Sequence, residues 1–130
     1  MNTTKRAGLL ALAVTFSAGI HAALVPEHLK EMPPLGYSFI AAAAIGALIA
    51  WALVAWPNDR RIPAVAALFC AGQILTWALF VTVHVPGFSG TPEPVEVIAL
   101  VSKAVEVIGV MLALPLVGTR RFRRLDVSLA

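Results

Sequence analysis

The sequence predicts an all-α fold, an integral membrane bundle of four helices. Its 130 residues are 59% hydrophobic and only 13% charged, whereas about 25% of the residues in an average soluble domain are charged. A chain this apolar has too little polar surface to cover a soluble core, so we expect the lipid bilayer to be its solvent. The length allows one compact domain, which we expect to span residues 1–130.

Four apolar stretches are each long enough to cross the hydrocarbon core, which takes roughly 20 helical residues. They cover residues 7–25, 35–56, 62–85 and 95–117. None of them alternates strictly between polar and apolar residues, so helices fit better than barrel strands. Prolines stand at the breaks because proline lacks an N–H and restricts the residue before it. Pro26 is expected to mark the turn after the first helix, and Pro115 to kink or end the last one.

The first and second stretches have further sequence signals. Residues 7–25 follow Lys5 and Arg6 as in a signal peptide, but Ile20 and His21 are poor cleavage-site residues, so we expect this helix to be retained. In the second stretch, small residues recur every fourth position, a pattern that allows helices to approach closely. They are Ala42, Gly46 and Ala50.

The basic residues predict the orientation of the bundle. Eight of the ten lie before the first helix, between the second and third, or after the fourth. By the positive-inside rule these segments and both termini are cytoplasmic, and the loops 26–34 and 86–94 are extracytoplasmic. We expect the basic residues to meet anionic lipid headgroups and expect no nucleic-acid partner. They are Lys5, Arg6, Arg60, Arg61, Arg120, Arg121, Arg123 and Arg124.

Histidine and glutamate gather on the predicted outer side of the membrane. Imidazole and carboxylate together suit zinc or copper, which makes a divalent metal one candidate ligand. A structural polar network and plain solvated loop residues are the alternatives. The candidate metal ligands are His21, His28, Glu31, His84 and Glu93, with Glu27 and Glu96 as further polar neighbours.

The fourth stretch carries two charges inside the membrane. Lys103 and Glu106 are three residues apart, so they share one face of a helix. A charge at the bilayer centre costs about 2.5–3.5 kcal/mol on insertion scales, so it should face protein or a water pocket. We expect an ion pair that fixes helix packing or, alternatively, a site that handles protons or ions. Gln73 and Thr76 on the third stretch are candidate polar partners.

These motifs resemble a family of small four-helix bacterial membrane proteins found mainly in actinobacteria and related groups. The shared motifs are H-x4-P-E-H-x2-E after the first helix, a Gly-x-Pro-Glu-Pro loop after the third, and K-x2-E in the fourth. Where the family often has a polar or basic residue at the end of the third helix, this chain has Thr82, Val83 and His84. The resemblance implies the fold and a bacterial inner-membrane location. It does not point to any particular activity. It places in the family pattern His21, Pro26, Glu27, His28, Glu31, Glu93, Lys103 and Glu106.

Three classes of function are compatible with this sequence. The first is a membrane protein whose outer His/Glu cluster binds a divalent metal or a small ligand. The second is an accessory subunit of a larger membrane complex or a homo-oligomer, and the third is a proton- or cation-coupled carrier that uses Glu106 and Lys103. An enzyme is not favoured because the sequence has no phosphate loop, no Ser-His-Asp set and a single cysteine, Cys70, in an apolar run.

Overall fold

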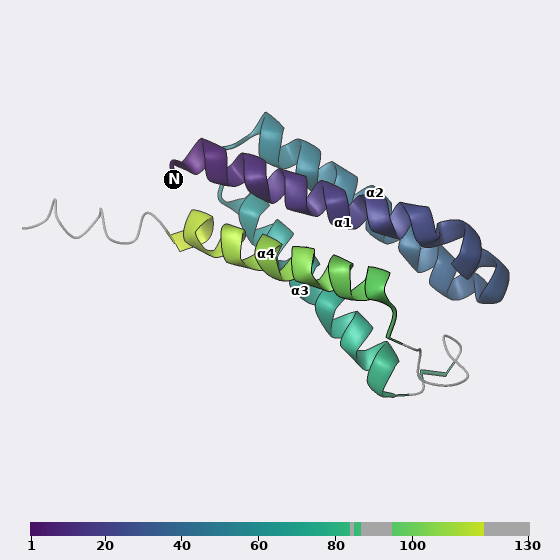
Figure 1. The fold of residues 1–130 in the computed structure, drawn as a ribbon. Helices are drawn as coiled ribbons and strands as arrows, with labels where there is room; N and C mark the ends of the chain where they lie inside the picture. Colours follow the sequence, from purple (N-terminus) through teal and green to yellow (C-terminus); the bar gives the residue numbers. More distant parts are fainter. Residues whose placement is uncertain (84, 87–94, 119–130) are drawn as a thin grey trace, which may run out of the picture.

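A computed structural model describes residues 1–83, 85–86 and 95–118. Within them the chain forms four helices and no strand: α1 (Thr3–Glu31), α2 (Pro33–Ala55), α3 (Arg61–Thr82) and α4 (Val97–Gly118) (Figure 1). The prediction of an all-α, four-helix fold is confirmed. All four helices are long and apolar enough to cross a membrane, which supports a multi-pass membrane protein.

The first helix is longer than the sequence predicts. Instead of turning at Pro26, α1 continues through it to Glu31, and the chain reverses at Met32. Pro26 removes one donor near the end of the helix, whereas Met32 precedes Pro33 and is pushed out of the helical region. With 29 residues, α1 is about 43 Å long, longer than the ~30 Å hydrocarbon core.

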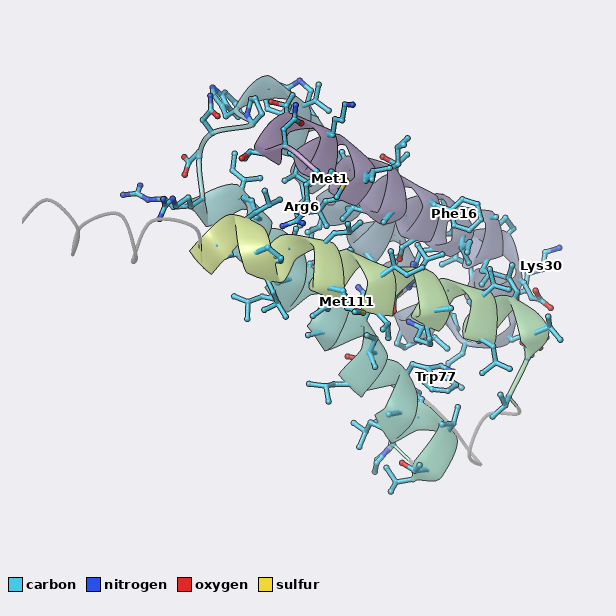
Figure 2. All side chains as sticks on the ribbon, turned by 60° about the vertical axis from the view of Figure 1, so that its left-hand side comes forward. Met1, Arg6, Phe16, Lys30, Trp77 and Met111 are labelled. Carbon is cyan, nitrogen blue, oxygen red and sulfur yellow. The ribbon has the colours of Figure 1, made fainter. Side chains whose placement is uncertain are left out.

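The bundle has two ends that differ in composition. The terminal end holds the start of α1, the end of α4 and the α2–α3 turn, and the hairpin end holds the α1–α2 turn, the end of α3 and the start of α4 (Figure 1). Basic side chains at the terminal end include Arg6, and Lys30 lies at the opposite end (Figure 2). Glu27, Glu31 and Glu96 are exposed at the hairpin end.

The helices α1 and α2 pack side by side along their whole length, and α4 packs against both α1 and α3. Glycine residues on α2 allow α1 and α2 to approach each other closely. A Cβ added at Gly36 would lie 2.7 Å from the backbone N of Leu29, and one at Gly46 would lie 2.9 Å from the Cβ of Ala18. The small residues predicted on this helix therefore serve packing inside the chain: Ala42, Gly46 and Ala50 are all buried.

The contact between α2 and α3 is short. Towards the hairpin end, α3 diverges from the other three helices (Figure 1). Towards the terminal end lies an apolar core, which includes the fully buried side chains of Leu10, Val14, Leu53 and Cys70.

The surface is apolar and the interior contains polar groups, the reverse of a soluble domain. Large side chains that face outward include Leu12, Leu68 and Met111, each about two thirds exposed or more. The buried polar residues are Ser17, His21, Ser102 and Glu106. Hydrocarbon stabilises such an exterior, and water would not.

Replacing Gly36 by alanine is expected to destabilise the α1–α2 hairpin by about 1–3 kcal/mol, because the new methyl group meets backbone that cannot rotate away. Gly72→Ala on α3 is the control, since nothing lies within 4 Å of its added Cβ. Thermal unfolding in detergent measures both. Equal midpoints for Gly36→Ala and Gly72→Ala would contradict the close approach.

Candidate functional site

The buried carboxylate of Glu106 lies near the middle of α4 and is 0% exposed. Its Oε1 accepts hydrogen bonds from the hydroxyls of Ser17 on α1 at 2.8 Å and Ser102 on α4 at 3.0 Å. Its Oε2 lies 2.6 Å from Nζ of Lys103. Lys103 also donates to the backbone carbonyl of Gln73 on α3 at 3.3 Å. One carboxylate thus connects three helices.

This arrangement balances charge where charge is expensive. An isolated ion in an apolar medium is strongly disfavoured, whereas a paired and hydrogen-bonded one is tolerated. Glu106 has a cation at one oxygen and two hydroxyl donors at the other. The two charges predicted on the fourth stretch are therefore brought together as an ion pair inside the bundle.

His21 belongs to the same cluster and is only 6% exposed. Its Nδ1 lies 2.8 Å from the backbone carbonyl oxygen of Ser17, one turn earlier on α1. A carbonyl oxygen only accepts, so the ring must carry a proton on Nδ1, and in the neutral ring Nε2 is then an acceptor.

His28 repeats this geometry two turns further along α1. Its Nδ1 lies 3.0 Å from the carbonyl oxygen of Leu24, and its ring stacks on Phe39 of α2 with centroids 4.3 Å apart. His21 contacts the same phenyl ring at 5.1 Å. His21 and His28 are separated by a rise of about 10 Å along the helix axis, yet both of their rings contact the phenyl ring of Phe39.

A cavity of about 240 Å³ lies next to the Glu106 cluster, between α3 and the other helices. His21, Gln73, Ser102 and Lys103 form its polar wall, and most of its remaining wall is apolar. Trp77 projects from α3 into this space (Figure 2). The other lining residues are Ile20, Leu24, Leu35, Ser38, Phe39, Ala42, Thr76, Phe80 and Ala99.

The predicted metal ligands are not gathered by the described part of the chain. His21 is buried in the cavity wall, His28 is half-buried beside Phe39, and Glu31 is exposed. No group of three or more His, Cys, Asp or Glu side chains among residues 1–83, 85–86 and 95–118 could hold a metal ion. His84 and Glu93 lie outside the described residues.

Ser17 and Ser102 are the site residues that sequence reasoning missed. Each stands four residues before a polar residue of the cluster, Ser17 before His21 and Ser102 before Glu106. That spacing places them on the same helix face. A search for hydroxyls one turn before His21 and Glu106 would have found both.

Breaking the ion pair from one side is expected to cost roughly 3–5 kcal/mol of stability, because the remaining charge stays buried without its partner. Lys103→Met and Glu106→Leu should each lower the unfolding midpoint strongly, while the double variant recovers most of the loss. Lys30→Met, at an exposed position, is the control. Additive losses in the double variant would show that the two side chains act independently.

Comparisons of the chain with protein-family models, with curated proteins and with solved structures give no match. The chemistry of the site is therefore inferred from its own side chains. These are a buried ion pair, a histidine with a defined tautomer, and an apolar cavity beside them.

Proposed function

We propose that this protein is a multi-pass protein of the bacterial cytoplasmic membrane that binds a small ligand in the cavity beside His21. The observation that supports it best is the wall of that cavity, where polar groups from α1, α3 and α4 meet in otherwise apolar surroundings. Ligand pockets in proteins commonly combine an apolar lining with a few placed polar groups. With about 240 Å³, this one suits a small molecule or the head of a larger one.

The charge distribution supports an outward-facing cavity. The terminal end carries Lys5, Arg6, Arg60 and Arg61, and the positive-inside rule assigns such an end to the cytoplasm. The hairpin end, near which the cavity lies, then belongs to the outer half of the membrane. A ligand would enter from the outer leaflet or from the extracytoplasmic side.

A divalent metal is the other ligand class that the sequence favours. Nδ1 bonded to a backbone carbonyl leaves Nε2 for a metal, an arrangement common in metal sites, and His21 and His28 both have it. Metal analysis of purified protein tests this. Equal metal content in the wild type and in His21→Ala/His28→Ala would contradict a metal held by these residues.

A carrier function has one specific observation in its favour. Glu106 is fully buried, and its partners Lys103 and Ser102 line the cavity. Buried carboxylates beside a cavity are typical of proton relays in transporters.

An accessory-subunit role has less support from the structure. The small-residue row, the surface best suited to another helix, packs on α1 and on Phe69 of the same chain. A larger assembly that survives purification from native membranes would favour it.

Occupancy of the cavity is expected to depend on its volume. Ala99→Phe places a ring in the cavity, whereas Ala104→Phe adds the same ring to an exposed face of α4. Native mass spectrometry of protein in nanodiscs made from native lipids should show a bound small molecule in the wild type and Ala104→Phe. The molecule should be lost in Ala99→Phe. Identical spectra for all three proteins would contradict ligand binding at this cavity.

If the protein is a carrier, Glu106→Gln is expected to reduce proton-coupled flux at least tenfold. The variant keeps a side chain that can bond Ser17 and Ser102 but loses the charge. Flux into proteoliposomes with an internal pH dye measures this, and Ala104→Phe again serves as the control. Unchanged flux in Glu106→Gln would remove the carrier hypothesis.

A further inference from the structure

The hydrogen-bonding groups of the cavity wall restrict the ligand. Nδ1–H of His21 is committed to the Ser17 carbonyl, so a neutral ring offers the cavity an acceptor, the lone pair on Nε2. A ligand that satisfies this atom must bring a hydrogen-bond donor. A ligand that has only acceptors, such as a carboxylate or a quinone carbonyl, could form no hydrogen bond with Nε2 of His21.

Donors line the same cavity as this acceptor. The side-chain amide of Gln73 is one of them. Lys103 directs N–H groups at Glu106 Oε2 and at the Gln73 carbonyl oxygen, and an ammonium has three hydrogens, so one is left for the cavity. The charge of Lys103 is already balanced by Glu106, which removes the electrostatic reason to bind an anion.

A hydroxyl group matches both requirements. It donates one hydrogen bond and accepts others, so it can donate to Nε2 of His21 and accept from the Gln73 amide or from Lys103.

The apolar wall favours an aromatic body for the ligand. Phe39 of α2 and Trp77 and Phe80 of α3 line the cavity on opposing helices. Aromatic rings pair favourably when they stack or meet edge to face, by about 0.5–1.5 kcal/mol beyond the area that they bury. An aliphatic chain would bury area but gain no such pairing.

The open side of the cavity determines the route of entry. Because α3 diverges from α2 towards the hairpin end, Ser38 and Thr76 line the cavity and are exposed as well. In a bilayer this opening faces lipid, so the ligand has to be lipid-soluble.

From these observations we propose that the cavity binds a lipid-soluble aromatic alcohol, a phenol or a hydroquinone, whose hydroxyl lies between Nε2 of His21 and the donors Gln73 and Lys103. This rests on the proposed ligand-binding role of the cavity and specifies its ligand class.

The test compares 4-hexylphenol with 4-hexylanisole, its methyl ether, which has the same ring and chain but no donor. Trp77 reports binding by its fluorescence in a Trp51→Phe/Trp56→Phe background in nanodiscs, because it lines the cavity. The phenol is expected to bind about tenfold more tightly than the ether, the effect of one hydrogen bond to a buried acceptor.

His21→Phe should bring this preference down to about onefold, because it keeps a ring against Phe39 but has no acceptor. His21→Gln, whose amide oxygen accepts, should restore part of it. If His21→Phe does not fold, His21→Gln against His21→Leu gives the same comparison.

The outcomes separate this inference from the proposed function. Equal affinity for both probes, abolished by Ala99→Phe, would overturn the aromatic-alcohol class and leave ligand binding intact. The same conclusion would follow if neither probe binds but native mass spectrometry shows a bound molecule that is lost in Ala99→Phe. If neither probe binds and no adduct depends on Ala99, both proposals fall.

Discussion

The buried carboxylate of Glu106 is the constraint on which the rest of the bundle depends. In a chain whose exterior is solvated by hydrocarbon, burial of apolar area gives little drive for helices to associate, and polar contacts and close packing take over that role. Glu106 must have partners, and it finds them on α1 and, through Lys103, on α3. Satisfying one charge therefore fixes the relative positions of three helices.

The same constraint explains why the two ends of the bundle differ. On the terminal side of Glu106 the helices meet through small and aliphatic residues, and Gly109 of α4 approaches Cys70 of α3 so closely that a Cβ would lie 2.9 Å from its sulfur. On the hairpin side α3 diverges from α2 (Figure 1), and large aromatic side chains line a cavity there. The polar cluster lies at the boundary, where it contributes both to packing and to the wall of the cavity.

Sequence alone could predict the features that depend on local spacing. Hydrophobic length gave the four helices, and the three-residue spacing of Lys103 and Glu106 gave their pairing on one helix face. The turn at Pro26 was wrong because a proline near a helix end removes a single donor, and the Pro33–Pro34 pair is the stronger stop. The cavity could not be predicted, since it depends on how far α3 diverges from α2, a property of the whole bundle.

Ser17 connects the ion pair of the cluster with the histidine that lines the cavity. Its hydroxyl donates to Glu106, and its backbone carbonyl accepts from His21. The ion pair thus holds α1 in position, and the carbonyl of that helix sets the tautomer of the histidine that faces the cavity. Because a helix carbonyl cannot donate, Nε2 is the acceptor of the neutral His21 ring whichever ligand the cavity binds. The chemistry that the cavity presents is therefore a consequence of how the membrane-embedded charge is neutralised.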